Sequence, residues 1–228
     1  MLNQTTHKNI LLQILKEIYT DTSLGPLLGF KGGTAAYLFY GLDRFSVDLD
    51  LDLLDETKED YVFEKIKNIL NNFGEIKEKF KKRNTLFFIL SYNLEAQNIK
   101  IEISRRNFGS QYELKNYLGI SMLVMARADM FAHKLVALTD RPNLTNRDLY
   151  DLWFCLKNNW EINKEIAEKR TKMNFKDYLK KCLLVAEGVE ERNILSGIGE
   201  LLDEKQKKWI KENLKKDLIF LLKLKLEE

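Results

Sequence analysis

The stretch Phe30–Leu54, FKGGTAAYLFYGLDRFSVDLDLDLL, places the strongest constraint on how this 228-residue chain can fold. Its second half, Arg44–Leu54, alternates polar and apolar residues with the period of a β-strand. Asp48, Asp50 and Asp52 would therefore share one face of that strand. The opposite, apolar face needs cover, whereas three adjacent carboxylates repel one another and cannot be buried dry. We therefore expect a sheet with one packed face and one open, acidic face.

A glycine pair precedes the acidic strand by one short helix. Gly32 and Gly33 lie between an expected strand, Leu27–Lys31, and an expected helix, Thr34–Tyr40. Glycine lets the backbone approach a phosphate closely, and free N–H groups at a helix start favour an anion. Thr34 either adds a hydroxyl donor or serves as the N-cap. Alone, the two parts could be a tight turn and an exposed edge strand, but together they offer a phosphate cradle beside carboxylates suited to Mg²⁺.

Composition excludes several classes of protein. No apolar run reaches the roughly 18 residues of a transmembrane helix, and the first residues lack the pattern of a signal peptide, so no membrane partner is expected. The two cysteines, Cys155 and Cys182, have no metal or redox spacing, which favours a reduced, cytoplasmic protein. The net charge of +3 is too small to indicate a partner.

The periodicity of the sequence changes near residue 118. Before it, helices are expected over residues 6–20 and 59–73, with further strands at 76–80, 85–91 and 98–104 and a turn at 95–98. After it, every segment has helical spacing: 121–138, 147–158, 161–167, 174–185, 192–202 and 205–226, with Pro142 separating the first two. We predict an α+β protein, with a mixed sheet and flanking helices in residues 1–118 and a helical bundle in residues 119–228.

The string KGGTAAYLFYGLDRFSVDLDLDL resembles the AbiEii/AbiGii toxin family of nucleotidyltransferases, within the DNA polymerase β-like nucleotidyltransferase superfamily. In that family a Gly-Gly-Thr turn is followed by an Arg-x-Ser-x-Asp-x-Asp strand, here Arg44, Ser46, Asp48 and Asp50. The resemblance covers about residues 10–155. It implies a nucleotidyltransferase fold for the first domain and an enzyme of the EC 2.7.7 type.

The family pattern also implies a third acid on a later strand, and Glu102 in IKIEISRR is the candidate. Its alternative is an ordinary outward residue of an amphipathic strand. With Asp48 and Asp50, Glu102 would hold Mg²⁺ or Mn²⁺ and act in catalysis. Asp52 lies one step beyond the ligand positions and is left outside the metal site.

The resemblance further implies residues that bind the NTP. Lys134 is assigned a catalytic and a nucleotide-binding role, because a lysine on an apolar helix either extends to water or reaches a phosphate. Arg147, Asp148 and Asp151 match an Arg-Asp-x-x-Asp helix start, where a structural role is an equal alternative. The active cleft is then expected between the two domains. The full nucleotide-binding set is Gly32, Gly33, Thr34, Arg44, Ser46, Lys134, Arg147, Asp148 and Asp151, with Arg44 either binding phosphate or bracing the acidic strand.

The resemblance implies the toxin of a toxin–antitoxin pair, with a cognate antitoxin protein as partner. Relatives imply an RNA acceptor, with the 3′ end of tRNA as the expected one. Two alternatives stay open: transfer to a protein or a small molecule such as an antibiotic, and an inactive domain that binds nucleotide or RNA. The lysine-rich runs 77–83 and 205–225, and Arg105 or Arg106, either are solvated or contact phosphate or RNA.

Overall fold

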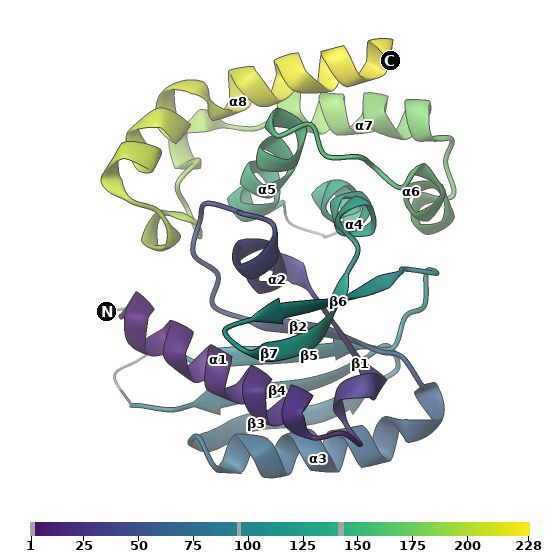
Figure 1. Ribbon diagram of the computed structural model, residues 1–228. Helices are drawn as coiled ribbons and strands as arrows, with labels where there is room; N and C mark the ends of the chain where they lie inside the picture. Colours follow the sequence, from purple (N-terminus) through teal and green to yellow (C-terminus); the bar gives the residue numbers. More distant parts are fainter. Residues whose placement is uncertain (1–2, 95–96, 141–143) are drawn as a thin grey trace. The chain divides into compact units, whose positions relative to one another are not determined.

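The structure, a computed structural model, describes residues 3–94, 97–140 and 144–228 (Figure 1). Pro142 and part of the turn expected at residues 95–98 lie outside the described residues. The chain divides into two compact units: Met1–Asn107 with Gln111–Ala126, and Phe108–Ser110 with Arg127–Glu228. The first unit extends past the boundary expected near residue 118, because the residues on both sides of that position form strands.

The first unit is built on a mixed sheet, which confirms the predicted fold class. Its described strands follow the order β3-β4-β5-β2-β1-β7-β6. In the middle of the sheet, β2 is antiparallel to β1 and parallel to β5. The strands are β1 Leu28–Lys31, β2 Leu49–Leu53, β3 Glu75–Lys82, β4 Thr85–Ser91, β5 Ile99–Ser104, β6 Tyr112–Tyr117 and β7 Ile120–Met125.

Three helices accompany this sheet: α1 Gln4–Thr20, α2 Gly32–Phe39 and α3 Glu59–Asn71, with short 3-10 turns at Gly25–Leu27 and Glu56–Lys58. In Figure 1, α1 and α3 lie on one side of the sheet and α2 on the other. Each of the two longer helices buries an apolar stripe at helical spacing, as Leu11, Ile14 and Ile18 do in α1. The apolar face of β2 is thereby covered.

The acidic strand is shorter than predicted. Only Leu49–Leu53 pairs as β2, so the prediction of a strand is wrong for residues 44–48. The last pair between β1 and β2 joins Lys31 to Asp50, because there the chain leaves the sheet and enters α2. On that side the described sheet offers residues 44–48 no strand to pair with. Side chains hold this segment instead.

One strand, β7, occupies the beginning of the helix that was predicted over residues 121–138. Tyr112–Tyr117 and Ile120–Met125 form the β6–β7 hairpin. Its two-residue turn is Leu118 and Gly119, both with positive φ (50° and 81°), the backbone that such turns favour. The helix prediction was wrong here because a short apolar run fits either period, and because this turn lacks the usual Asn or Asp.

The second unit is the predicted helical bundle. Its helices are α4 Arg127–Asp140, α5 Asn146–Lys157, α6 Lys164–Thr171, α7 Phe175–Glu187 and α8 Glu204–Glu227. The helix expected over residues 192–202 is wrong: two 3-10 turns, Glu191–Asn193 and Gly199–Leu201, stand there, separated by Gly197 with a φ of 71°. None of the described helices is both long and apolar enough to cross a bilayer.

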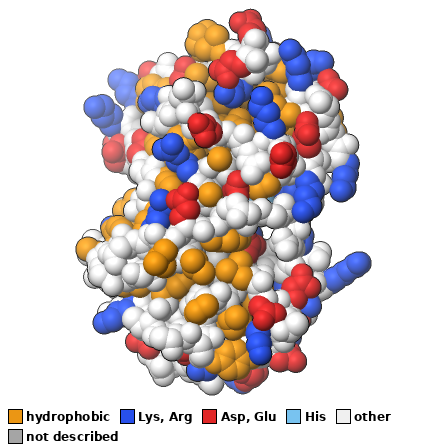
Figure 2. All heavy atoms as spheres, turned by 45° about the vertical axis from the view of Figure 1, so that its right-hand side comes forward, with side chains coloured by type: hydrophobic (Ala, Val, Ile, Leu, Met, Phe, Trp, Pro, Cys, Tyr) orange, Lys and Arg blue, Asp and Glu red, His pale blue; other side chains and the backbone are white. Residues whose placement is uncertain are grey.

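Charged side chains of both signs are interspersed on the face drawn in Figure 2. The lysine-rich run 77–83 shows the same mixing. It falls largely on β3, where Lys77 pairs with Glu75 at 2.5 Å and Lys81 pairs with Asp60. This strand therefore does not present lysines alone, and part of its positive charge is matched locally.

His7 on α1 helps to hold the segment before β2. The ring is fully buried; Nε2 lies 2.9 Å from the Val47 carbonyl oxygen and Nδ1 lies 2.9 Å from the Tyr92 hydroxyl. A carbonyl only accepts, so Nε2 carries the proton and Nδ1 accepts from Tyr92. Burial lowers the pKa of His7 from its ordinary value of 6.5, and the opposing effects of Val47 and Asp48 do not cancel it. The folded protein therefore favours the neutral ring.

We predict that the free energy of unfolding falls as the pH drops below about 6.5. The unfolded chain then takes up a proton at His7 before the folded one does, so protonation favours unfolding. The loss is about 1.4 kcal/mol for each unit between the two pKa values, and it stops growing below the folded pKa. His7→Gln keeps a donor for the Val47 carbonyl without titrating. Urea unfolding at about pH 5.5 and 7.5 should show a smaller difference for this variant than for the parent.

The matched control is His133→Gln, which changes the other histidine of the chain, in the second unit. It should leave the part of the pH dependence that belongs to His7 in place. Equal pH dependence of the parent and His7→Gln would contradict the assignment.

Candidate functional site

Two of the predicted acids lie opposite each other on neighbouring strands. The parallel register of β2 and β5 pairs Asp50 with Glu102, and both side chains are half-buried. The alternate residues, such as Leu49 and Ile101, are fully buried on the other face. The alternative for Glu102 was an ordinary outward residue of an amphipathic strand. That description leaves out one feature of the structure, which is that the Glu102 side chain lies on the same face as Asp50.

Asp48 precedes β2 and is placed by contacts of its backbone. Thr34 Oγ1 donates a hydrogen bond to the Asp48 carbonyl oxygen at 2.5 Å, and His7 holds the adjacent Val47 carbonyl. The Asp48 side chain is half-buried. Thr34 is itself buried, so its hydroxyl braces the acidic segment. The N-cap role considered for Thr34 is wrong, because the helix begins at Gly32 and Lys31 occupies the N-cap position.

Gly32 brings the start of α2 against Asp50. Its φ is 81°, and a Cβ added to it would lie 2.3 Å from Asp50 Oδ2, far inside contact distance. Only glycine allows both this left-handed backbone and this approach. The Asp50 carboxylate thus lies beside the first turn of a helix, where unpaired backbone N–H groups favour negative charge.

Gly33 makes room for two further residues of the predicted set. A Cβ at Gly33 would lie 2.7 Å from Ser46 Oγ and 3.1 Å from Arg44 Nη2. Arg44 is buried, and its Nη1 donates to the Phe45 carbonyl oxygen at 2.9 Å. Of the two roles considered for Arg44, the bracing contact is thus present. The structure brings Gly32, Gly33, Thr34, Arg44, Ser46, Asp48, Asp50 and Glu102 together in the first unit.

Lys100, a residue that the sequence reasoning did not single out, shares the acidic face. Its Nζ lies 3.3 Å from Glu102 Oε2. Burial works to lower the pKa of Lys100, but nearby carboxylates outweigh burial and the pKa is raised. In order of strength, these carboxylates are Asp50, Asp48 and Glu102. The alternation of IKIEIS points Lys100 and Glu102 to the same face, so the sequence carried this signal.

The described residues include no group of three or more His, Cys, Asp or Glu side chains already gathered around a metal position. The donor chemistry nevertheless fits Mg²⁺ or Mn²⁺, which take carboxylate oxygens and complete their coordination with phosphate and water. The Lys100 ammonium supports this fit, because it already lies 3.3 Å from Glu102, on the face that Glu102 shares with Asp50. These acids therefore already stand beside a positive charge.

Asp52 has other partners. Lys31 Nζ lies 2.6 Å from its Oδ1, and the Tyr112 hydroxyl donates to its Oδ2 at 2.5 Å. The Tyr112 ring lies directly over Gly29, where an added Cβ would be 2.1 Å away. These contacts tie β1, β2 and β6 together. Leaving Asp52 outside the metal site stays a prediction.

In the second unit, two predicted residues form an ion pair. Lys134 Nζ on α4 lies 2.5 Å from Asp151 Oδ2 on α5, and the Asp151 side chain is only 1% exposed. Lys134 therefore neither extends freely into water nor stands alone on its apolar helix. The pair links α4 to α5, and removing the Lys134 ammonium alone would be strongly destabilising because the Asp151 carboxylate would stay buried without a partner.

Asp148 takes part in the cap of α5. The Thr145 side chain accepts a hydrogen bond from the Asp148 backbone N–H, and Thr145 Oγ1 donates to Asp148 Oδ2 at 2.7 Å. This is the structural role considered for an acid at a helix start. Arg147 stands beside it in the first turn and is half-buried.

Arg105 serves the sheet of the first unit. Its Nη2 lies 2.5 Å from Glu59 Oε2, and its Nη1 donates to the Arg83 carbonyl oxygen at 3.2 Å. Arg105 therefore joins the β3–β4 turn to α3, which accounts for it without phosphate or RNA. Arg106, the other arginine considered, is exposed.

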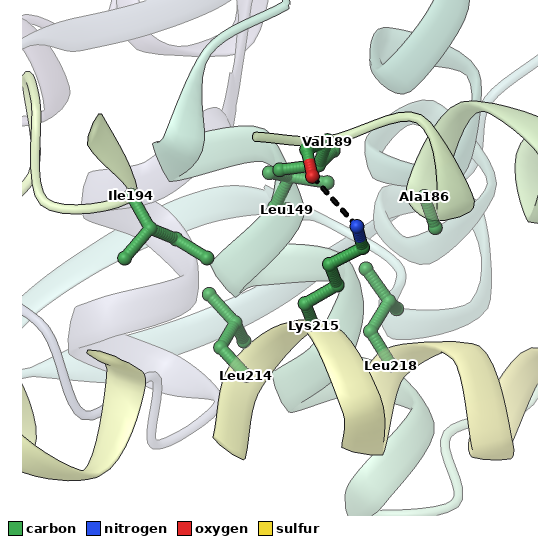
Figure 3. A pocket seen from close by; sticks show the side chains of 7 residues that line it. All are labelled: Leu149, Ala186, Val189, Ile194, Leu214, Lys215 and Leu218. Atoms are coloured by element: carbon green, nitrogen blue, oxygen red, sulfur yellow. Dashed lines mark hydrogen bonds between the residues drawn. The ribbon is translucent and has the colours of Figure 1, made fainter. Parts of the chain in front are cut away.

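A narrow hollow in the second unit is apolar apart from one lysine. Figure 3 shows Lys215 of α8 reaching across to Val189, whose carbonyl oxygen accepts from Lys215 Nζ at 2.7 Å. The lining residues are Leu149, Ala186, Val189, Ile194, Leu214, Lys215 and Leu218. None of these residues belongs to the predicted site, and the Lys215 ammonium already donates a hydrogen bond to a backbone carbonyl group. The hollow offers little chemistry for a polar ligand.

Comparison with known proteins bears on the whole chain. The family model described as nucleotidyl transferase AbiEii toxin, type IV toxin–antitoxin system, matches residues 13–219. Two solved structures from Helicobacter pylori resemble the fold. One, JHP933, has a TM-score of 0.64 and 24% identity, covering 100% of this chain and 95% of that one. The other, described as a candidate nucleotidyltransferase, has a TM-score of 0.62 and 23% identity, covering 100% and 98%.

At these identities the solved structures show the fold alone, and no curated protein matches the sequence significantly. The family match is different in kind, because it spans both units and every residue of the predicted site. The family resemblance of the glycine pair and the acidic stretch is thus confirmed, and it extends over residues 13–219. The chain belongs to the nucleotidyl transferase AbiEii toxin family.

Proposed function

We propose that the acidic face of the first unit transfers a nucleotidyl group from an NTP to an acceptor with the help of divalent metal ions. One observation carries the proposal. The β2–β5 register aligns Asp50 with Glu102, the Lys100 ammonium lies 3.3 Å from Glu102, and Gly32 brings a helix start against the same Asp50. A place for cations beside a place for phosphate is what a metal–nucleotide complex needs.

Asp48, Asp50 and Glu102 would hold Mg²⁺ or Mn²⁺, with NTP as the substrate. When bound, such ions stabilise the attacking and the leaving oxygen of an in-line displacement. The protein's part is to fix the carboxylates. The β2–β5 register aligns Asp50 with Glu102, and the Thr34 hydroxyl fixes the backbone of Asp48. Positioning of this kind supplies much of the catalysis in phosphoryl-type transfers.

The phosphates of the NTP would bind at the start of α2. Backbone N–H groups of Gly32 and Gly33 favour an anion there, and Ser46 adjoins Gly33. Thr34 and Arg44 support the cradle through their contacts with carbonyl groups. For Lys134, Arg147, Asp148 and Asp151 the nucleotide-binding role stays a proposal. The buried Asp151 would orient the Lys134 ammonium, which can then meet a phosphate as a fixed point charge.

For the acceptor we propose RNA, with the 3′ end of tRNA as the first choice, and for the biological role the toxin of a pair with its own antitoxin protein. The family description supports the toxin–antitoxin part and an NTP substrate. The family resemblance of the motifs supports the RNA acceptor. Transfer to a protein or a small molecule is the competing outcome, and the labelled product distinguishes the two.

We predict that Asp48→Asn lowers nucleotidyl transfer by about 100-fold or more, because a metal-binding charge is lost with little change in shape. Incubation with Mg²⁺, each labelled NTP and total tRNA measures the label gained by RNA, and RNase shows whether the product is RNA. Asp60→Asn is the matched control, since Asp60 is an exposed residue that pairs with Lys81 at the surface. No labelled product with the parent, or equal labelling by Asp48→Asn, would overturn the catalytic assignment.

We also predict that Gly32→Ala lowers the transfer rate by about 100-fold, because its Cβ would displace the Asp50 carboxylate. Gly119→Ala is the control: it has the same φ of 81°, but a Cβ there meets nothing within 4 Å. Each variant should lose about 1 kcal/mol of stability from the left-handed backbone, and Gly32→Ala should lose more because its Cβ also meets Asp50. Only Gly32→Ala should also lose activity. A parallel loss in both would mean that backbone strain, and not the contact with Asp50, is responsible.

A further inference from the structure

The Lys100 ammonium occupies the acidic face where a cation is needed, yet the proposed reaction gives it no task. Register explains its position. Asp50 pairs with Glu102, and Lys100 stands two positions before Glu102 on β5. Side chains on alternate positions share a face, which brings Lys100 to the side of Asp48, Asp50 and Glu102. Its Nζ lies 3.3 Å from Glu102 Oε2.

The charge of Lys100 affects how the neighbouring carboxylates can bind a metal ion. Three carboxylates on one face repel one another, and an ammonium among them relieves the repulsion. A divalent ion bound to the same oxygens would do so more strongly, but it would also repel the ammonium at close range. The two cations therefore compete. The Lys100 side chain is 35% exposed and ends a flexible four-carbon stem, so it can move toward solvent when a metal ion enters.

We propose that Lys100 is a built-in counter-cation of the acidic face: it keeps Asp48, Asp50 and Glu102 together without metal, and it competes with the divalent ion for them. This inference rests on the proposed function, because it takes those carboxylates as the metal-binding residues. Lys100 is thus a positioning residue that sets metal affinity. It accounts for acids that share a face with an ammonium group, while the described residues include no group of three or more such acids around a metal position.

The test measures Mn²⁺ binding to the full chain without nucleotide, by the electron paramagnetic resonance of free Mn²⁺. Lys100→Met removes the charge and keeps a similar length, and we expect it to bind Mn²⁺ about tenfold more tightly than the parent. Lys100→Arg keeps the charge and should show no such gain. Lys79→Met, an exposed lysine on β3, makes the same change in net charge away from the acids. It should bind like the parent.

Thermal unfolding supplies a second measurement. In EDTA, Lys100→Met should melt about 2–4 °C below the parent, because the carboxylates then lack their cation. Saturating Mn²⁺ should abolish this deficit. Lys79→Met and Lys100→Arg should stay close to the parent in both conditions. A merely structural lysine would leave a deficit that Mn²⁺ does not remove.

The possible failures are distinguishable. If the parent binds Mn²⁺, Asp48→Asn does not, and Lys100→Met shows no gain in affinity, the counter-cation role is overturned and the proposed function stands. If neither the parent nor Lys100→Met binds Mn²⁺, the metal site and the counter-cation role fall together. A tenfold gain confined to Lys100→Met supports the inference, as does a melting deficit that Mn²⁺ removes.

Discussion

The parallel pairing of β2 with β5 is the interaction on which the site depends. It places Asp50 level with Glu102 and buries Leu49 and Ile101 on the opposite face. A shift of one residue would turn the leucines of β2 outward and the aspartates into the core, so burial itself fixes the register. Burial of the apolar side chains thus determines where the carboxylates on the opposite face lie. The geometry of the acids is a consequence of apolar packing on the other side of the strand.

The short length of β1 matters as much as this register. β1 ends at Lys31, opposite Asp50, and the chain turns at once into α2 through Gly32. The acidic face therefore meets a helix start. Because β1 stops there, the segment before β2 has no partner on that side and relies on Thr34, Arg44 and His7. The end of β1 thus explains both why a helix begins beside Asp50 and why the backbone of Asp48 is held by side chains.

The sequence predicted the fold class and picked out residues that lie together in the first unit, but it misplaced individual strands and helices. Glycines and alternating acids signal chemistry through residue type and spacing, and the structure brings all the residues assigned to the first unit together. The β6–β7 hairpin was missed because a six-residue apolar run has no reliable period, and its turn residue Leu118 is unusual at positive φ. The start of β2 was predicted five residues too early, because the alternation of polar and apolar residues continues through residues 44–48. Strand pairing also needs a neighbouring strand, which the local sequence does not reveal. The alternation of IKIEIS places Lys100 and Glu102 on one face of their strand. The structure adds that Asp50, on the neighbouring strand, lies on the same face.

In this site, residues that hold the backbone lie next to residues that are proposed to bind metal or substrate. A loss of activity in a variant therefore does not by itself show that the substituted residue contacts the substrate. Thr34 would qualify as a phosphate ligand by its position in the motif, yet its hydroxyl is spent on the Asp48 carbonyl. Removing that hydroxyl would displace Asp48 and lower activity without any lost contact to substrate. The same holds for Arg44, whose guanidinium holds the Phe45 carbonyl. We would assign a residue to the reaction only where its substitution lowers activity and leaves stability unchanged. Substituting a residue that holds the backbone lowers both activity and stability, whereas substituting a residue that binds the substrate lowers activity alone.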